Sequence, residues 1–181
     1  MTANSLDSFT AAIRSVWGPI SSELVATCRG RLEELMRADP AEDWLAALLA
    51  ERPASRELYR DPAGGFMLLA HNENEGLYRP PHDHGRAWVV YGVQSGELEI
   101  RTYANVQSPS GEPRLVLRDS SLLRPGEARA YLPGDIHDTR CVTASALLFR
   151  FTERDLRRED QVERKLTRFV ERGGYWTVPQ E

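Results

Sequence analysis

Histidines are the residues of this chain whose spacing first suggests chemistry. His82 and His84 lie two residues apart, shortly before an apolar segment of alternating character that begins at Trp88. Side chains two apart on extended backbone point to the same side, so both imidazoles can face one cavity. His137 follows fifty-three residues after His84, where the Pro133-Gly134 turn ends another expected strand. Three converging imidazoles can hold a divalent metal, and three protein ligands leave coordination positions open, as in catalytic sites.

Short β-strands are the elements expected to position these histidines. Apolar segments bounded by glycine, proline or polar residues recur at short intervals, a pattern typical of an all-β barrel or sandwich. The expected strands are 66–71, 88–93, 97–103, 114–117, 122–123, 128–132 and 146–151. The sequence therefore predicts a β domain over 53–152.

Helices are expected on both sides of this β domain. Apolar residues recur at helical spacing in 6–16, 24–36 and 44–49. Asp39, followed by a proline, predicts the start of the third helix. We interpret 1–52 as a helical segment packed on the barrel. In the tail 153–181, a helical pattern runs up to Arg172 and a glycine pair, which predicts a surface helix. The three segments are expected to form one domain.

Composition and charge bound the function classes. The 181 residues are 41% hydrophobic and 28% charged, which is ordinary for a globular domain with a core. The net charge of −4 gives no indication of nucleic acid or an anionic membrane as a partner. No signal peptide or membrane span is expected, so the cytoplasm is the expected location. Cys28 and Cys141 are too far apart in sequence to indicate a zinc ribbon or a disulfide framework, and the oligomeric state stays open.

The histidine segments resemble the two motifs of the cupin superfamily. The H-x-H pair is followed twelve residues later by Gly96, and the third histidine stands in a Pro-Gly-Asp-Ile-His segment. A cupin is a small antiparallel jelly roll closed on a metal site, so the resemblance implies a mostly β jelly-roll barrel with these three histidines as ligands. The first motif usually also holds a glutamate. Here Trp88 or Val89 stands at that position, and neither can bind metal.

Within the cupins, residues 56–151 are similar to the cysteine dioxygenase type I family, the thiol dioxygenases. That family binds Fe(II) through three histidines and lacks the glutamate, as this chain does. The resemblance implies Fe(II), dioxygen as co-substrate and a small carboxylate-bearing substrate. It also puts Arg56 at the position of the arginine that clamps the carboxylate, where the other interpretation is a solvated loop charge. The wording P-P-H-D-H-G further resembles a bacterial branch of predicted metal-dependent double-stranded β-helix enzymes.

The expected last strand departs from that family. Thiol dioxygenases carry a Ser-x-His-x-Tyr set there, whereas 147–151 reads Leu-Leu-Phe-Arg-Phe. His71 or Tyr91 could present the missing polar group to the pocket. For His71 three interpretations are open: a fourth metal ligand, a proton carrier beside the ligands, or a hydrogen-bonded core histidine.

Two more residues are candidates for substrate binding. Arg150 lies on an apolar strand and needs an anionic partner if it is buried. It is therefore either a clamp for an acidic substrate or half of a structural ion pair. Trp88, at the position of the missing glutamate, is the other candidate.

Three functions are compatible with these residues. The first is an Fe(II) dioxygenase that acts on a small carboxylate-bearing molecule, such as a thiol acid. The second is a zinc, nickel or manganese cupin that catalyses hydrolysis or isomerisation with a metal-activated water. The third is a non-enzymatic cupin that binds a small molecule. The presence of all three ligands favours an enzyme over the third.

Overall fold

Three helices begin the part of the chain that the computed structural model describes, residues 4–108 and 111–179. They are α1 (Ser5–Val16), α2 (Ser22–Leu35) and α3 (Asp43–Glu51). Asn4 caps α1, because its side chain accepts a hydrogen bond of 2.8 Å from the amide of Asp7. Ser21 caps α2 in the same way, at 3.1 Å from the amide of Leu24. None of the helices in the described ranges is long and apolar enough to cross a membrane.

The third helix begins later than the sequence predicts. The carboxylate of Asp39 accepts a hydrogen bond of 2.9 Å from the amide of Ala41, which closes a separate turn before α3. The residue at the capping position of α3 is Glu42. Its carboxylate accepts hydrogen bonds of 2.8 Å from the amide and the hydroxyl of Ser5. The side chain that could cap α3 is thus engaged by the start of α1.

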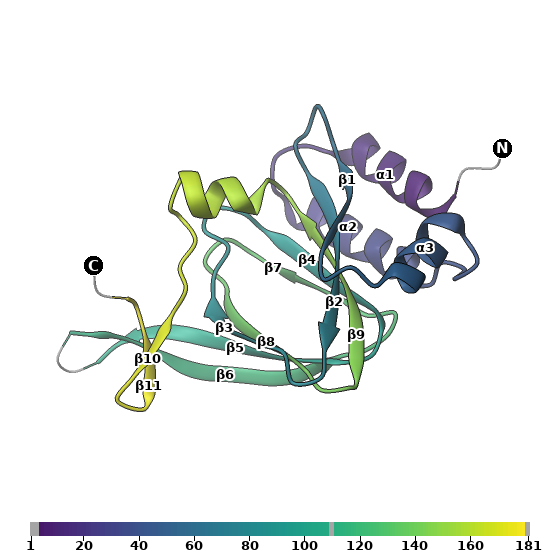
Figure 1. Cartoon of the computed structure of the whole chain (residues 1–181). Helices are drawn as coiled ribbons and strands as arrows, with labels where there is room; N and C mark the ends of the chain where they lie inside the picture. Colours follow the sequence, from purple (N-terminus) through teal and green to yellow (C-terminus); the bar gives the residue numbers. More distant parts are fainter. Residues whose placement is uncertain (1–3, 109–110, 180–181) are drawn as a thin grey trace.

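Most of the strands form two antiparallel sheets that face each other (Figure 1). In the described residues, the five-stranded sheet has the order β1 (Arg56–Arg60), β2 (Met67–Asn74), β9 (Ser145–Thr152), β4 (Val89–Ser95), β7 (Ala128–Tyr131). The four-stranded sheet has the order β3 (Tyr78–His82), β8 (Ile136–Cys141), β5 (Leu98–Gln107), β6 (Pro113–Leu123). Strands that follow each other in sequence often lie in different sheets, as in a jelly roll. The mostly β, jelly-roll class predicted from the sequence is confirmed, with two packed sheets instead of one closed barrel.

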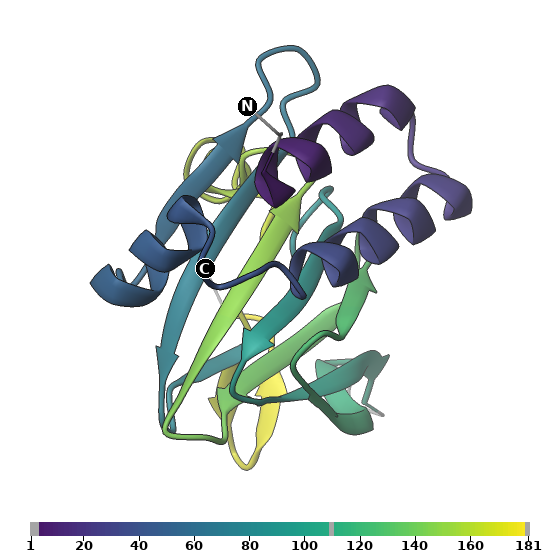
Figure 2. The same cartoon turned by 90° about the vertical axis from the view of Figure 1, so that its right-hand side faces the viewer.

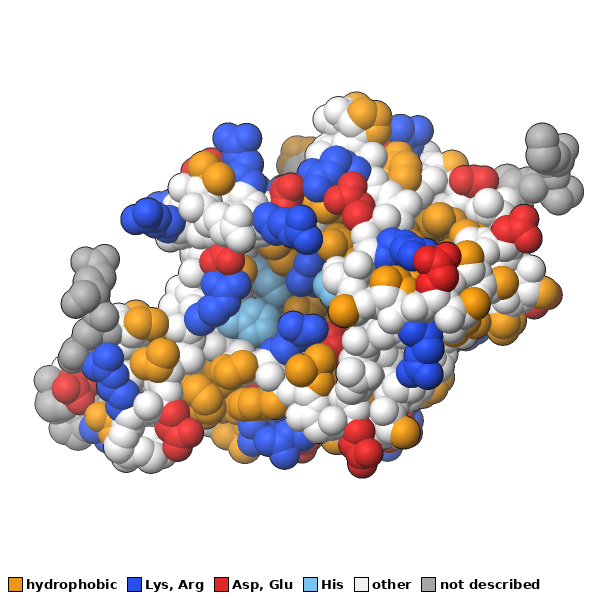
Figure 3. Space-filling view, in the orientation of Figure 1, with side chains coloured by type: hydrophobic (Ala, Val, Ile, Leu, Met, Phe, Trp, Pro, Cys, Tyr) orange, Lys and Arg blue, Asp and Glu red, His pale blue; other side chains and the backbone are white. Residues whose placement is uncertain are grey.

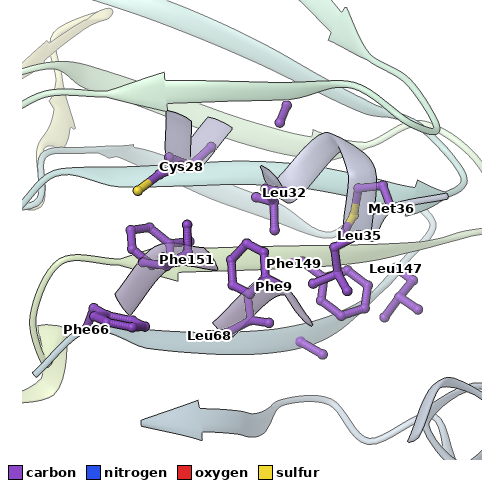
Figure 4. Packing of buried hydrophobic residues seen from close by; sticks show 14 of the residues in the cluster. Phe9, Cys28, Leu32, Leu35, Met36, Phe66, Leu68, Leu147, Phe149 and Phe151 are labelled. Atoms are coloured by element: carbon purple, nitrogen blue, oxygen red, sulfur yellow. The ribbon is translucent and has the colours of Figure 1, made fainter. Parts of the chain in front are cut away.

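The outer face of the five-stranded sheet is apolar and is covered by the helices (Figure 2). Leu68, Val90, Phe149 and Phe151 point to this side and are fully buried. Figure 4 shows how the phenylalanines of β9 pack under α2, close to Leu32. This packing explains why apolar residues recur at helical spacing in the first part of the chain, because each helix buries one apolar face against the same sheet.

The inner face of the same sheet looks toward the four-stranded sheet. Because side chains alternate along a strand, the neighbours of the outer residues point inwards. Val89 and Tyr91 of β4 pack there with Leu98 and Ile100 of β5. The space between the sheets therefore holds core side chains and, toward one end, the side chains of the candidate site.

The strand boundaries differ from the expected ones in a few places. The segments 114–117 and 122–123 belong to one strand, β6, which pairs along β5. The sequence did not indicate β3, because Pro80 and Pro81 lie inside it. The strand tolerates these prolines because it lies at the edge of its sheet. The turn after β4 needs Gly96, since its φ is +72° and a Cβ there would lie 2.1 Å from the carbonyl oxygen of Ser145.

The prediction of a long surface helix in the C-terminal tail is wrong. The helical part ends with the π-type segment η1 (Arg158–Val162). An extended stretch then leads to a hairpin of β10 (Val170–Arg172) and β11 (Tyr175–Thr177) (Figure 1). Val162, one of the apolar residues in that helical pattern, is 70% exposed.

Tertiary hydrogen bonds replace the helical ones in this tail. The amide of Phe169 donates to the carbonyl of Pro81 at 2.9 Å, and the amide of Asp83 donates to the carbonyl of Thr167 at 3.0 Å. The side chain of Asp83 in turn accepts a hydrogen bond of 2.8 Å from the amide of Thr167. The tail is thus held in extended form against the segment that carries the H-x-H pair.

Candidate metal centre

Three imidazoles meet between the two sheets. His82 is the last residue of β3, and His137 lies directly opposite it on β8. His84 follows in the turn after β3. The ring centroids lie 5.2 Å apart for His82 and His84, 4.9 Å for His82 and His137, and 5.0 Å for His84 and His137. Their ligand nitrogens all lie within 4.8 Å of one another. The structure therefore brings the three predicted ligands together into one group that can hold a metal ion.

The protonation of this group suits a metal. Burial lowers the pKa of His82, and lowers that of His84 and His137 well below the ordinary value, so all three are neutral near pH 7. The Nδ1 atom of His82 is held by the carbonyl oxygen of Pro80 at 2.9 Å, which leaves its Nε2 free. Both ring nitrogens of His137 and Nδ1 of His84 are buried without a hydrogen-bond partner among the described residues. Neutral imidazoles with unpartnered nitrogens are the donor set that a divalent transition metal takes, so the residues fit the metal.

The histidines form the group without a carboxylate from the part of the chain that the structure describes. Of the two residues at the position of the motif's glutamate, Trp88 points outwards and Val89 packs in the inner core. Among the described residues, the three-histidine ligand set expected from the sequence therefore has no carboxylate as a fourth ligand.

A cavity of about 550 Å³ connects the histidines to the surface. His82 and His84 lie in its wall, together with His71, Tyr91 and Arg150 from the inner face of the five-stranded sheet. Figure 3 shows histidine side chains at the bottom of this hollow, with lysine and arginine side chains around it. Three of the five candidates beyond the ligands therefore lie where a substrate would bind.

Tyr91 is the candidate in closest contact with the metal ligands. Its hydroxyl lies 3.2 Å from Nε2 of His84, within hydrogen-bond distance. Burial raises the pKa of Tyr91, against the opposing effect of the nearby Arg150 guanidinium. The hydroxyl therefore keeps its proton near pH 7 and can donate a hydrogen bond.

A second tyrosine at the centre was missed by the sequence reasoning. The ring of Tyr131, on β7, lies against the ring of His137 with the centroids 4.1 Å apart. Its hydroxyl is buried and has no hydrogen-bond partner in the described residues. Burial also raises the pKa of this phenol. The sequence did hold a signal for Tyr131, because this residue ends the strand that leads to His137. Only the pairing of β7 with β4, however, points its side chain inwards.

His71 is neither a ligand of the group nor a hydrogen-bonded core residue. It is not part of the three-histidine group, and its Nε2 is buried without a partner among the described residues. Burial is the main cause that lowers its pKa to about 3, with the charges of Arg150 and Arg79 acting in the same direction. Of the three interpretations, a group that faces the cavity beside the ligands remains.

Arg150 lies on the inner face of β9, opposite Tyr91 of β4 and Leu69 of β2. It is half-buried, and its Nε is buried with no hydrogen-bond partner among the residues that the structure describes. The described residues place no carboxylate within ion-pair distance of it. Of the two interpretations of Arg150, the structural ion pair is therefore not found among the described residues.

Two of the candidates lie outside the site. Trp88 points to the helix-covered face, where its ring stacks on Trp17 and contacts Phe151, so its assignment to substrate binding is wrong. Arg56 lies on the edge strand β1 and forms an ion pair with Glu51 at the end of α3. It is opposite the outward-facing Ala70, and it does not line the cavity. Strand alternation therefore turns both side chains away from the histidines.

Several residues of the cavity wall come from the tail and from β2 and β3. They are Glu73, Arg79, Leu156, Arg157, Asp160, Leu166, Arg168 and Phe169. The tail reaches this position because Glu159, buried in η1, accepts hydrogen bonds of 2.9 Å from the amide and Nε of Arg86, two residues after His84. The close approach also requires Gly85, where a Cβ would lie 2.9 Å from Oε1 of Glu159. The cavity wall and the H-x-H segment are therefore directly bonded to each other.

Comparisons with known proteins find only distant structural similarities. No family model and no curated protein sequence matches the chain. The Schizosaccharomyces pombe Cnp3 cupin domain is similar with a TM-score of 0.44 at 10% identity, over 59% of this chain and 63% of that chain. Oxalate oxidase in complex with glycolate gives 0.44 at 20% identity, over 64% and 62%. KdgF from Halomonas sp. gives 0.42 at 20% identity, over 60% and 83%. The chain spans less than two thirds of the first two proteins. Its own strand order shows a mostly β jelly roll with a three-histidine group between the sheets.

Proposed function

We propose that this chain is a metal-dependent cupin oxidoreductase, an Fe(II) dioxygenase that acts on a small anionic substrate. The observation that carries the proposal is the buried group of His82, His84 and His137 without a carboxylate. Three neutral imidazoles leave the charge of a divalent ion uncompensated, which favours an anionic substrate. They also leave coordination positions open. The expected partners are the substrate and dioxygen, in the cytoplasm.

Fe(II) held there would supply the activation of dioxygen beside the substrate. The side chains of the cavity supply binding and proton positions. Arg150 can bind the anionic group of the substrate, because its guanidinium faces the cavity and has no carboxylate partner in the described residues. Tyr91 can donate a hydrogen bond beside His84, and the neutral His71 can accept one at Nε2.

A second candidate is a zinc, nickel or manganese hydrolase or isomerase. The observation in its favour is Glu73, a buried carboxylate in the cavity wall that is paired with Arg79 at 2.7 Å. A carboxylate next to a metal centre can move protons in hydrolysis or isomerisation. The dioxygenase requires no such base.

The test starts with the metal. The protein is purified without oxygen, its metal content is measured, and oxygen uptake is followed with a panel of carboxylic acids that includes thiol acids. We expect about one iron per chain and substrate-dependent oxygen uptake. His82→Ala with His84→Ala should lose the metal, whereas His71→Gln should keep it and lose only activity.

Each outcome separates the candidates. Metal content that survives the double substitution would remove the site assignment. Iron-loaded protein that consumes no oxygen with any acid, but releases products from the same panel with zinc or manganese, would favour the second candidate. Bound metal without turnover of any acid would indicate a non-enzymatic protein that binds a small molecule.

A further inference from the structure

The main cavity continues beyond the candidate metal centre. A smaller cavity of about 100 Å³ adjoins it, and Arg150, Leu156 and Arg157 line both. The rest of the small cavity is formed by Met67 and Leu69 of β2, by Thr152 of β9, and by Ser55, Glu57, Arg60 and Asp155. Both of these carboxylates are paired with Arg60, at 2.9 and 3.0 Å. The two cavities therefore lie next to each other, and the wall between them carries the two arginines.

The positive charges in the wall of the main cavity are not all balanced by carboxylates. The arginines of the main cavity are Arg79, Arg150, Arg157 and Arg168. Two of them are neutralised, Arg79 by Glu73 at 2.7 Å and Arg168 by Asp160 at 2.8 Å. Among the described residues, no carboxylate lies within ion-pair distance of Arg150 or Arg157. The surplus positive charge is thus located on the wall that the two cavities share.

Arg150 is placed close to the metal centre but not in contact with the ligands. It pairs in register with Tyr91 on the neighbouring strand, and strands lie about 4.8 Å apart. The hydroxyl of Tyr91 is in turn 3.2 Å from Nε2 of His84. A group bound by Arg150 is therefore separated from a group at the histidines by about the width of one tyrosine.

The unpartnered Nε of Arg150 indicates a missing acceptor. Buried N–H groups nearly always have a hydrogen-bond partner, because an unsatisfied donor is costly. A guanidinium binds a carboxylate or a phosphate through two parallel hydrogen bonds, which would satisfy Nε together with a terminal nitrogen. Arg157, which is exposed and lines the same two cavities, would add a second positive charge.

The volume decides between small and larger acids. A cavity of about 550 Å³ with an extension of about 100 Å³ lies in the range that encloses ligands of drug size. A three-carbon acid would leave most of this space to water. The combined volume and the two arginines on the shared wall both favour a longer molecule.

We infer that the site takes an elongated anionic substrate, with one polar end at the three histidines and a carboxylate or phosphate at Arg150 and Arg157. The inference rests on the proposed metal centre and names the substrate class for it. It requires an acid longer than three carbons, whose far anionic group lies at the junction of the two cavities.

The test uses Zn(II)-loaded protein and isothermal titration calorimetry with α,ω-dicarboxylates from malonate to suberate, and acetate as the short control. We expect glutarate or a longer diacid to bind at least tenfold more tightly than malonate. Arg150→Gln should weaken that binding at least tenfold, and Arg157→Gln about threefold because its side chain is exposed. Arg158→Gln is the matched control, since the neighbouring Arg158 is 72% exposed and pairs with Glu163 at 3.4 Å. It should leave the affinity unchanged.

The outcomes separate this inference from the metal assignment, because zinc content is measured on every sample. Full zinc content with equal affinity for malonate and the long diacids, or with no effect of Arg150→Gln, would overturn the inference and leave the metal centre intact. Loss of zinc in the wild type would overturn the metal centre itself. Should Arg150→Gln fail to fold, Arg150→Lys keeps the charge but not the paired hydrogen bonds, and it should still lower the affinity for the long diacid.

Discussion

The two faces of the five-stranded sheet are made by alternate residues of the same strands, yet they differ in almost every physical respect. On the outer face, Leu68 and Phe149 are completely buried in a dry apolar core under the helices. On the inner face, His71, Tyr91 and Arg150 surround a cavity, and polar atoms of the histidine and the arginine are buried without a hydrogen-bond partner in the described part of the chain. Each such atom costs about 1–3 kcal/mol. The outer face thus stabilises the fold, and the inner face gives up stability to form a site.

The largest difference between the faces should appear in core truncations. Phe149→Ala removes a fully buried ring of the outer face and should lower the free energy of unfolding by about 3–5 kcal/mol. Leu148→Ala, one residue away on the inner face, should cost only about 2–3 kcal/mol, since it widens an existing cavity and creates no sealed void. Urea denaturation of the metal-free proteins measures both. A larger loss for Leu148→Ala would contradict the assignment of the two faces.

Metal should return stability to the inner face. A ligand that binds only the folded state stabilises it by about 2.7 kcal/mol at a concentration of 100 times its dissociation constant. We expect a shift of this size in the free energy of unfolding when Zn(II) is added to the wild type. His137→Ala should abolish the shift, and the inner-face variant His71→Gln should keep it. An equal loss in both variants would show that His71 is a ligand after all.

The inner face should also make stability dependent on pH. The pKa of His71 is lowered from 6.5 to about 3 in the folded state, so the unfolded state binds the proton more strongly between these values. Its contribution is therefore fully present above pH 6.5 and is lost as the pH falls toward 3. The slope reaches about 1.4 kcal/mol per pH unit. In metal-free protein, His71→Gln should flatten the stability curve between pH 4 and 6 by up to this amount, and an unchanged slope would contradict the burial of a neutral imidazole.

The smallest effect is expected for the arginine outside both the core and the site. Arg56→Gln breaks an ion pair with the exposed Glu51, and such pairs contribute about 0.2–1 kcal/mol. Zinc content and diacid affinity should stay at wild-type values, in contrast to Arg150→Gln. A loss of diacid affinity in Arg56→Gln would restore the carboxylate clamp that the family resemblance implies.

Local patterns predicted much of the fold. The helical stripes of the first 52 residues and the turn-bounded strands depend on neighbours in the sequence, so their types could be recognised without tertiary contacts. The predictions were wrong where contacts with residues far apart in sequence compete with the local pattern. Asp39 forms its own turn while Glu42 is engaged by Ser5, and the tail gives up helical hydrogen bonds for bonds to Pro81 and Asp83.

The same division holds for the site. The sequence by itself determined that His82 and His84 share one side and that a turn precedes His137, because both are local properties of the backbone. It could not tell that Trp88 turns outwards and Tyr131 inwards, since the facing of a strand is set by what packs on each side of its sheet. Only the tertiary structure set His137 opposite His82 and brought Arg157 to the same wall as Arg150. Register and tail docking depend on contacts between residues far apart in sequence, and no local period encodes them.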